Sequence, residues 1–397
     1  MKLYFFTEAR ILEGNDGNYY NPGGAQRKNL FERYLQVFSE VIVVARVYKN
    51  HEYEINSDEI VNSDNIEVYS LPYYLGPLHY LYKMHSVKKV ISKIILPGNA
   101  YILRLPGNIG NLAASLLQKK NIPYGVEIVG DPYEVFSKNG IKHPLKKYFQ
   151  SKLTKALKSN VIKSSANLYV TNYNLQNRYP SQIGVFNIGV SDVKIKREEI
   201  LKSPKKFYFD NDKTVKIISI GSLDQMYKGP DVLIKAISIV NQQGFKCELN
   251  WVGKGKYLNN MKILCKKLGV ENNVNFLGHF SEKELINQEL DRNDIFILSS
   301  RTEGLPRVII EAFARGLPVI GSNVGGIPEL VDEEYLFESE NITMLASKII
   351  SLIKQNGKLN ESSENNLKKV QLFIDIELDK KRKLFFEELK TIVLKNN

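Results

Sequence analysis

Apolar and polar positions alternate along this chain in two repeating patterns. Short apolar runs, of which residues 100–105 and 295–298 are examples, have the length and composition of buried β-strands. Between such runs lie segments whose apolar residues recur at helical spacing, as in residues 109–120. Strands that alternate with helices are typical of an α/β fold with a mostly parallel sheet. The same pattern predicts further strands at residues 3–6, 41–45, 66–70, 124–129, 168–171, 183–186, 215–221, 247–252, 274–277 and 318–321.

The alternation is interrupted in residues 194–212, which are polar, charged and without periodicity. Such a segment predicts a linker between domains. A chain of 397 residues is too long for one ordinary core, and two α/β domains account for its length. We therefore predict an amino-terminal domain at residues 1–195 and a second domain at residues 196–375. Helical periodicity predicts late helices at residues 342–354 and 374–395, with residues 376–397 as a separate terminal helix.

One stretch, SSRTEGLPRVIIEAFARGLPVIGSNVGGIPEL at residues 299–330, joins a strand to a loop and a helix. It follows the predicted strand at 295–298, and its apolar residues from Val308 onward recur at helical spacing. Pro306 can occupy the first helical position, and Gly316 followed by Pro318 predicts the end of the helix. The loop therefore lies where a strand ends and a helix begins. Free N–H groups and the helix dipole favour an anion such as phosphate at this place.

Two carboxylates flank this loop: Glu303 before the helix and Glu311 within it, with seven residues between them. Carboxylates repel phosphate, so in an anion site they are expected to face neutral groups that carry hydroxyls. A sugar attached to a nucleotide has such groups, and one glutamate would then bind the sugar while the other binds the ribose. Two solvated glutamates at a helix start are the plain alternative.

The whole stretch, with its segments GLP, EAFARGLPVI and GGIPELV, closely resembles the E-x7-E signature of the retaining family 4 glycosyltransferases. This family is also called group 1, has the GT-B fold and includes enzymes of the bacterial surface-polysaccharide type. The resemblance implies two Rossmann-like domains that face each other across a cleft, with a C-terminal helix that crosses back to the first domain. It also implies an acceptor site in the first domain and a nucleotide-sugar site in the second.

The resemblance assigns roles to the residues of this stretch. Glu303 would lie by the transferred sugar as a catalytic residue, and Glu311 would bind the ribose hydroxyls. The backbone that follows Glu303 would hold the diphosphate, and its residues are Gly304, Leu305, Pro306, Arg307 and Val308.

Lys228 precedes a helix that is predicted to begin near residue 230. A cation there can neutralise a diphosphate that the helix dipole already attracts. Relatives usually add an arginine shortly after the preceding strand; the present chain has Gly221 and Ser222 there, and we expect these two residues to contact the substrate. We therefore expect the diphosphate clamp to rest on Lys228, as a catalytic residue, with help from Arg307. An ordinary surface lysine is the alternative.

Relatives hold the base with backbone at the ends of two strands, which correspond here to Gly253 and to His279 with Phe280. The five histidines show no metal-ligand spacing, and no D-x-D motif follows a strand. We therefore expect metal-independent transfer, no metal site, and no cofactor beyond the nucleoside diphosphate sugar that serves as donor substrate. Cys247 and Cys265 indicate neither a disulfide framework nor a zinc site.

In the first half of the chain, Gly23 and Gly24 end a long loop before a helix that is predicted from Ala25. Glycines there let the backbone approach a ligand, and in the family such a pair lies near the donor phosphates and the acceptor. A plain loop-to-helix junction is the alternative. Arg104 and Asp131 lie at the carboxyl ends of predicted strands and are candidates for substrate contacts. Relatives often carry a histidine beside the glycine before Asp131, whereas this chain has Val129 there. The segment VEIVGDP resembles that of bacterial polysaccharide glycosyltransferases, which makes Asp131 the better candidate for a catalytic role.

Lysine and arginine outnumber acidic residues by 55 to 43, and the formal net charge of +12 favours anionic partners. Two segments with helical patterns are rich in lysine: residues 143–163 and the tyrosine-rich residues 71–95. Each could contact an anionic membrane surface, and the second could also line an acceptor groove. Packed helices with solvated lysines are the alternative. No apolar run reaches the length of a membrane span and the first residues lack a signal-peptide core, so we expect a cytoplasmic location, with peripheral contact at the inner face of the membrane left open.

We therefore predict a retaining glycosyltransferase that moves a sugar from a nucleoside diphosphate to a glycan or a lipid-linked glycan. A related GT-B phosphorylase or synthase that acts on a soluble glucan is the nearest alternative. A catalytically silent partner subunit is a second alternative, because the family arginine and histidine are missing. A nucleic-acid-binding protein is a third, but the lysines are spread along the chain and no RNP-type strand is present, so we expect no nucleic-acid partner.

Overall fold

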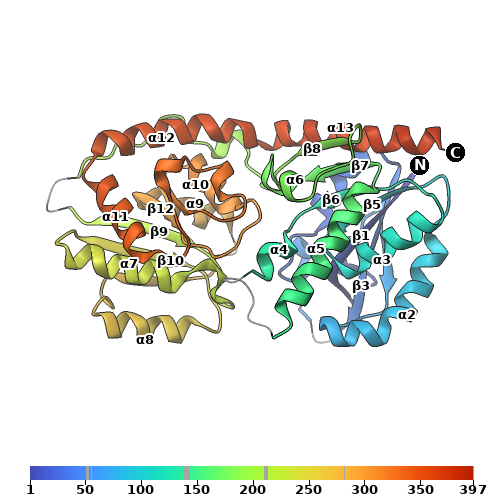
Figure 1. Cartoon of the computed structure of the whole chain (residues 1–397), viewed down its shortest axis with the longest axis horizontal. Helices are drawn as coiled ribbons and strands as arrows, with labels where there is room; N and C mark the ends of the chain where they lie inside the picture. Colours follow the sequence, from blue (N-terminus) through green and yellow to red (C-terminus); the bar gives the residue numbers. More distant parts are fainter. Residues whose placement is uncertain (51–52, 55, 138–143, 210–212, 281, 397) are drawn as a thin grey trace. The chain divides into compact units, whose positions relative to one another are not determined.

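The computed structural model describes residues 1–50, 53–54, 56–137, 144–209, 213–280 and 282–396 (Figure 1). The chain divides into two compact units: unit 1 contains Met1–Pro132, Ser151–Val190 and Asp379–Asn397, and unit 2 contains Tyr133–Gln150 and Ser191–Leu378. Each unit holds one largely parallel β-sheet together with helices. The predicted α/β class, with two Rossmann-like halves, is therefore confirmed. No sequence pattern indicated that Tyr133–Gln150 belongs to unit 2.

In unit 1 the described strands form a sheet in the order β4-β3-β1-β5-β6-β7-β8, and all neighbours on this path are parallel. The order reverses between β1 and β5, since β3 and β4 extend the sheet on one side of β1 and β5 begins the other side. Strand β2 pairs antiparallel with the end of β1, beyond a break in register after Phe6. The strands are β1 (Lys2–Glu13), β2 (Tyr19–Tyr20), β3 (Glu40–Lys49), β4 (Ile66–Leu71), β5 (Ala100–Leu105), β6 (Gly125–Ile128), β7 (Ala166–Tyr169) and β8 (Phe186–Gly189).

Two predictions for unit 1 are wrong. The helix expected from Ala25 is only a short α1 that continues as a 3₁₀ segment, Glu32–Gln36. Residues three apart lie on one side of a 3₁₀ turn, and Phe31 and Tyr34 accordingly both pack their rings on Phe5. The strand expected at residues 183–186 lies three residues later as β8, and Ile183 is fully exposed. The helices in this part of the chain are α1 (Lys28–Phe31), α2 (Gly76–Ile94), α3 (Asn108–Lys119), α4 (Pro132–Val135), α5 (Lys146–Ile162) and α6 (Asn174–Arg178).

The terminal helix α13 (Asp375–Lys395) contributes its residues from Asp379 onward to unit 1. Phe385, Phe386 and Leu389 of this helix are buried, and the ring centroid of Phe386 lies 4.7 Å from that of Tyr34. Gly125 in β6 leaves the space that these side chains fill, because a Cβ there would lie 2.9 Å from Phe385 and 3.1 Å from Leu389. The end of the chain is therefore part of the core of unit 1.

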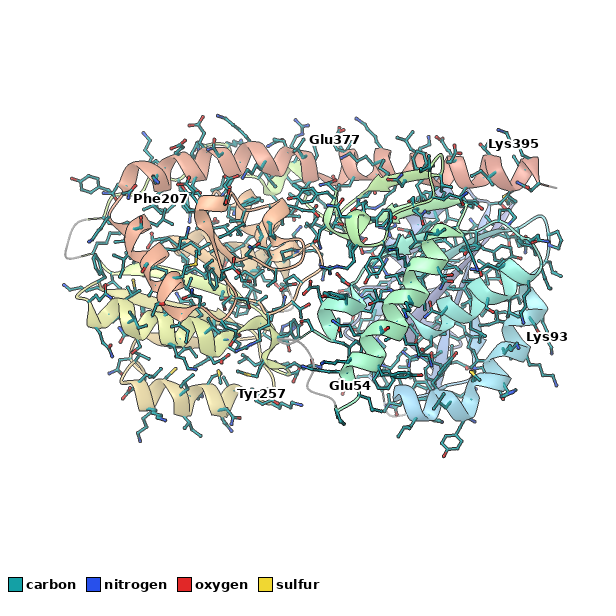
Figure 2. All side chains as sticks on the ribbon, viewed as in Figure 1. Glu54, Lys93, Phe207, Tyr257, Glu377 and Lys395 are labelled. Atoms are coloured by element: carbon teal, nitrogen blue, oxygen red, sulfur yellow. The ribbon has the colours of Figure 1, made fainter. Side chains whose placement is uncertain are left out.

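In unit 2 the described strands form a parallel sheet in the order β11-β10-β9-β12-β13-β14. The strands are β9 (Val215–Ile220), β10 (Cys247–Val252), β11 (Val274–Gly278), β12 (Ile295–Leu298), β13 (Val319–Ser322) and β14 (Leu336–Phe337). The helices are α7 (Pro230–Gln242), α8 (Leu258–Leu268), α9 (Lys283–Arg292), α10 (Arg307–Ala314), α11 (Ile342–Ile353) and α12 (Asn356–Val370). Figure 2 shows how side chains fill the space between these helices and the sheet.

Helix α12 is absent from the sequence prediction, because part of its buried side is polar. Ser362, Ser363 and Asn366 are buried together with Leu359 and Val370. These and other polar side chains bind the segment that the sequence predicted as a free linker. Ser363 Oγ accepts a hydrogen bond of 2.9 Å from the Lys205 N–H, and Asn360 Oδ1 accepts one of 2.7 Å from the Phe207 N–H. Residues 205–209 are therefore attached to α12, whereas residues 210–212 of the predicted linker lie outside the described residues.

Three further findings bear on the sequence predictions. No helix in the described part of the chain is both long enough and apolar enough to span a membrane. The basic helix predicted from residue 143 is α5, which begins at Lys146; residue 143 lies outside the described residues. Both cysteines are buried as free thiols, and burial raises the pKa of Cys247 to about 12 and that of Cys265 to about 11, so both stay protonated at neutral pH.

We expect Gly125→Ala to destabilise unit 1 by about 1–3 kcal/mol, because the added methyl group must displace Phe385 and Leu389. Gly357→Ala in α12 is the matched control, since a Cβ there meets no atom within 4 Å and alanine favours a helix. Denaturant unfolding measures the free energies of both variants. Equal stability of Gly125→Ala and wild type would contradict the packing of α13 on β6.

Candidate functional site

The order of strands in unit 2 reverses between β9 and β12, because β10 and β11 extend the sheet on the other side of β9. In open parallel sheets, ligands bind beyond the carboxyl ends of the strands at which the order reverses. The loop after β9 carries Lys228, and the loop after β12 carries Glu303. The topology thus brings two of the predicted catalytic residues to one edge of unit 2.

Lys228 ends a 3₁₀ segment, Met226–Lys228, which Gly229 joins to the start of α7. The aliphatic part of Lys228 lies against Gly221 at the end of β9: a Cβ on residue 221 would lie 2.8 Å from Lys228 Cγ. The indole N–H of Trp251 donates to the carbonyl of Gly221 over 2.9 Å and holds this turn in place. The predicted residue Gly221 therefore leaves room for the lysine side chain.

Lys228 and Glu303 form an ion pair, with 2.5 Å between Nζ and Oε1. The same carboxylate oxygen accepts a hydrogen bond of 2.6 Å from Ser300 Oγ. Both side chains are largely buried, with exposed fractions of 14% for Lys228 and 9% for Glu303. A partly buried ion pair has lost hydration on both sides, so a ligand that offers phosphate to the lysine and a hydroxyl to the glutamate can replace the internal contact.

Helix α10 begins at Arg307, one residue later than predicted, because Pro306 has an extended backbone with ψ 110° and serves as the N-cap. Within the described chain no side chain caps this end, and the first turn has no acidic residue. The N–H groups of Arg307 and Val308 therefore remain open to an anion, as the dipole of the helix favours. The preceding loop is fixed, since Gly304 accepts a hydrogen bond of 2.8 Å from the Gly326 N–H.

The other residues before α10 and inside it complete this part of the site. Leu305 is buried and anchors the loop, whereas the side chain of Arg307 is exposed. Glu311 lies one turn into α10 and is partly buried. Burial raises its pKa, and the positive charges of Arg307 and Lys283 oppose the shift. Within the described part of the chain Glu311 forms neither a hydrogen bond nor an ion pair, which leaves its carboxylate open to ligand hydroxyls.

The remaining predicted residues of unit 2 lie beyond the ends of β9, β10 and β11, which are neighbours in the sheet. Ser222 donates its hydroxyl hydrogen to Asp224 over 2.9 Å. The N–H of Gly253 donates to the carbonyl of Gly278 over 2.6 Å and ties two of these strand ends together. His279 is exposed and Phe280 is half-buried, directly after β11. Their predicted contact with a base stays a prediction.

Arg104, predicted to bind substrate, lies in unit 1 at the end of β5. Its Nη1 donates to Glu127 Oε2 over 3.0 Å, and Glu127 is only 1% exposed. Glu127 also accepts a hydrogen bond of 2.6 Å from Tyr34. Burial is the main reason that the pKa of Tyr34 is raised. The guanidinium of Arg104 thus neutralises a buried carboxylate, and a role toward a ligand stays a prediction.

Asp131 follows β6, is 4% exposed, pairs with Arg178 and accepts a hydrogen bond of 2.6 Å from Tyr179. Gly23 has φ 63°, and its N–H donates to Glu59 over 2.8 Å. A Cβ on Gly24 would lie 2.3 Å from the amide of Asn21. The glycine pair therefore shapes a tight loop, and its contact with a ligand stays a prediction. The expected catalytic role of Asp131 also stays a prediction.

Sequence reasoning missed Glu8, which lies within β1 at the break in its register after Phe6; β1 is one of the two strands between which the strand order of unit 1 reverses. Its Oε1 accepts a hydrogen bond of 2.7 Å from the Ile109 N–H in the first turn of α3, and its Oε2 accepts one of 2.8 Å from Tyr74. Unit 1 therefore fills the helix start at its reversal point with its own carboxylate, whereas unit 2 leaves the start of α10 open. An acidic residue two positions after the apolar run 3–6 was the signal that could have identified it.

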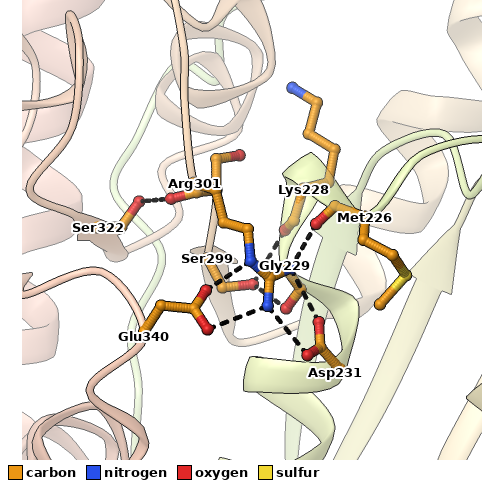
Figure 3. A network of polar contacts seen from close by, with 9 residues as sticks. Met226, Lys228, Gly229, Asp231, Ser299, Arg301, Ser322 and Glu340 are labelled. Atoms are coloured by element: carbon orange, nitrogen blue, oxygen red, sulfur yellow. Dashed lines mark hydrogen bonds and ion pairs between the residues drawn. The ribbon is translucent and has the colours of Figure 1, made fainter. Parts of the chain in front are cut away.

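Sequence reasoning also missed Ser300 and Arg301, which lie in the loop just after β12. The position of polar side chains at the carboxyl end of a central strand was the available signal. Figure 3 shows Arg301 between the start of α7 and Glu340.

In the described residues no group of three or more histidine, cysteine, aspartate and glutamate side chains could hold a metal ion. The expectation of metal-independent transfer stays a prediction.

Comparison with known proteins gives a consistent result. Residues 202–370 match the model of a family described as glycosyl transferases group 1. Over 373 residues the chain is 31% identical to Protein CapJ of Staphylococcus aureus. This match covers 93% of this chain and 91% of CapJ. Two solved structures share the fold. The apo lipopolysaccharide outer core galactosyltransferase WaaB has a TM-score of 0.67 and 13% identity, and covers 96% of this chain and 98% of its own. Anabaena HepE in complex with UDP-glucose has a TM-score of 0.64 and 16% identity, and covers 99% of each chain.

We expect Glu311→Gln to raise the free energy of unfolding at neutral pH, because the substitution removes a carboxylate whose ionisation burial disfavours. The raised pKa means that the wild type has its full stability below the ordinary glutamate pKa and loses part of it as pH rises through the folded-state pKa. The difference between variant and wild type should therefore shrink from pH 8 to pH 5. Thermal unfolding across this range checks the sign, and a variant that is less stable than wild type at pH 8 would contradict it.

Proposed function

Because the chain belongs to the group 1 glycosyltransferases, we propose that it transfers a sugar from a nucleoside diphosphate to a hydroxyl of a glycan or a lipid-linked glycan. The transfer retains the anomeric configuration and needs no metal ion. One observation carries the proposal: the uncapped start of α10 lies in the same loop as Glu303, which is paired with Lys228 at the strand reversal of unit 2. A cation, free N–H groups and a carboxylate are thus combined at one edge of the sheet.

Each of these groups matches one part of a nucleotide sugar. The ammonium of Lys228 leaves Glu303 and pairs with the diphosphate, whose other oxygens accept from the N–H groups of Arg307 and Val308. Glu303 then accepts hydrogen bonds from hydroxyls of the sugar. Glu311 does the same for the ribose. Arg307, which is exposed, adds a second positive charge near the phosphates.

The reaction breaks the bond between the anomeric carbon and the phosphate oxygen, and forms a bond from that carbon to the acceptor oxygen on the same face. The departing phosphate oxygen takes the proton of the acceptor hydroxyl, so no protein nucleophile is required. Negative charge grows on the diphosphate as the bond breaks. Lys228 and the start of α10 stabilise this charge because they are fixed in a largely buried setting before the reaction begins.

The relatives support the choice of substrate classes. HepE is described in complex with UDP-glucose, which favours a nucleotide sugar as donor. WaaB is a lipopolysaccharide galactosyltransferase, which favours an acceptor of cell-surface polysaccharide synthesis. The acceptor would bind unit 1, where the Gly23–Gly24 loop and Asp131 are the candidate contacts.

We also propose peripheral contact with an anionic membrane, through α2. This helix and the residue before it expose Leu75, Leu78, Leu81 and Tyr82, with exposed fractions between 57% and 86%. The helix contains Lys83, Lys88, Lys89 and Lys93 and has no aspartate or glutamate. Apolar side chains that enter the headgroup region beside lysines are the features of an interfacial helix. Such contact would place the enzyme at the inner face of the membrane, near a lipid-linked acceptor.

We expect one nucleoside diphosphate, and one of its sugars, to raise the melting temperature of the wild type when UDP, GDP and their sugars are tested in turn. A ligand at a hundredfold excess over its Kd stabilises the folded state by about 2.7 kcal/mol. Lys228→Met should lose the shift, and Lys262→Met, which removes an exposed lysine of α8, should keep it. Absence of any shift in the wild type would refute the donor site.

We expect Glu303→Gln and Glu311→Ala to separate turnover from binding. Glu303→Gln should lower turnover at least tenfold with donor affinity nearly unchanged, since this residue faces the reacting sugar. Glu311→Ala should instead weaken donor binding, because it removes the contact with the ribose. Steady-state kinetics and calorimetric titration of the donor distinguish the two. Equal losses of affinity and turnover in both variants would contradict these roles.

We expect the wild type to sediment with phosphatidylcholine vesicles that contain phosphatidylglycerol, and less with vesicles of phosphatidylcholine alone. Replacement of Leu78, Leu81 and Tyr82 by serine should reduce binding, because the apolar insertion is lost. Ile183→Ser, which changes a fully exposed isoleucine elsewhere in unit 1, is the control. Undiminished binding of the triple variant would rule out α2 as the contact.

A further inference from the structure

The guanidinium of Arg301 is surrounded by polar partners inside unit 2 (Figure 3). Nη1 and Nη2 each donate to one oxygen of Asp231 over 2.9 Å. Nε lies 2.5 Å from one oxygen of Glu340, and Nη2 donates to the other over 3.2 Å. Nη1 also donates to the carbonyl of Met226. These contacts involve all three nitrogens of the guanidinium.

These contacts join the two loops that carry Lys228 and Glu303. Met226 and Asp231 stand on either side of Lys228 in the chain, and Arg301 itself lies two residues before Glu303. The backbone N–H of Arg301 adds a hydrogen bond of 2.6 Å to the carbonyl of Tyr227. Beside it, Ser299 Oγ donates to the carbonyl of Gly229 over 2.9 Å. The loop after β9 is thus bound to the loop after β12 on both sides of Lys228.

The charge of Arg301 is neutralised within the protein. Its side chain is 13% exposed and faces two carboxylates, so it presents no uncompensated positive charge to a diphosphate. Burial lowers its pKa, but the hydrogen bonds to Asp231 and Glu340 outweigh burial and leave the pKa raised. In Figure 3 the ammonium end of Lys228 points away from this network, so the two cations have separate tasks.

We propose that Arg301 is a positioning residue for the transfer, which fixes Lys228 and Glu303 at the separation that a sugar diphosphate requires. The proposal rests on the proposed function of the site. Arg301 acts through the loop of Lys228 and not by contact with the donor. Lysine cannot replace it, because a single ammonium cannot donate two parallel bonds to Asp231 and at the same time reach Glu340 and Met226.

Unit 2 offers a matched control in Arg315, which follows α10. Its Nε donates to Asp291 over 2.7 Å, its Nη2 pairs with the other oxygen of Asp291, and its Nη1 donates to the carbonyl of Glu199 over 2.7 Å. Its side chain is 14% exposed, against 13% for Arg301. Arg315→Lys therefore removes a similar buried, two-pronged ion pair that does not involve the loop of Lys228.

The test is a double-mutant cycle on the affinity for inorganic pyrophosphate and for UDP and GDP, measured by calorimetry on the full chain. Arg301→Lys should weaken binding of pyrophosphate and of the preferred nucleotide at least tenfold, and Arg315→Lys less than twofold. Combination with Lys228→Met should add little to the effect of Arg301→Lys, because both changes remove the same contact. The effects of Arg315→Lys and Lys228→Met should be additive.

The outcomes distinguish this proposal from the function on which it rests. If Lys228→Met loses binding while Arg301→Lys behaves like Arg315→Lys, the donor site stands and the positioning role is overturned. Additive effects of Arg301→Lys and Lys228→Met overturn it as well. If the wild type binds none of the probes, both proposals fall. If Arg301→Lys does not fold, Glu340→Gln takes its place, because this variant keeps the other contacts of Arg301. Weaker binding of pyrophosphate and nucleotide by Glu340→Gln supports the positioning role, and unchanged binding overturns it.

Discussion

The backbone of the loop after β12 touches the backbone of two neighbouring loops, and the geometry of the candidate site depends on this contact. A Cβ on Gly229, whose φ is 64°, would lie 2.0 Å from the carbonyl oxygen of Ser299. A Cβ on Gly325, with φ 53°, would lie 2.1 Å from that of Glu303. Since glycine adopts such angles and leaves this space empty, the loops after β9 and β13 can hold Glu303 from both sides.

The two units share a topology but differ at the point where the strand order reverses. In unit 1 the carboxylate of Glu8 accepts a hydrogen bond from the first turn of α3, and so occupies the place where an anion would bind. In unit 2 the corresponding start of α10 is uncapped, and the nearby carboxylate, Glu303, is paired with Lys228. A small difference in side chains thus leaves the start of α10 open to an anion and closes the corresponding start of α3.

The sequence predicted the sheets well because buried parallel strands are continuous apolar runs, as the match of residues 247–252 and 295–298 to β10 and β12 shows. It failed where tertiary contacts decide. Polar Ser363 and Asn366 are buried in α12 because they bind other backbone segments, which periodicity cannot reveal. The E-x7-E stretch indicated a candidate site, but it could not indicate the contacts of Arg301, whose partner Met226 lies 75 residues away in the chain. Only the fold shows which charges meet.

The distinction between neutralised and open charges separates the candidate residues more sharply than their residue types do. Arg104 and Asp131 are candidates from their places at the ends of predicted strands, yet the fold pairs the first with Glu127 and the second with Arg178. A ligand that took the guanidinium of Arg104 would weaken the compensation of the buried Glu127 carboxylate, whereas the partner of Asp131, Arg178, is 29% exposed and can regain contact with water. Glu311 has no such partner within the described chain. The Lys228–Glu303 pair lies between these cases, because a diphosphate and a sugar hydroxyl can satisfy both members at once, and so the pair can open without leaving either charge alone.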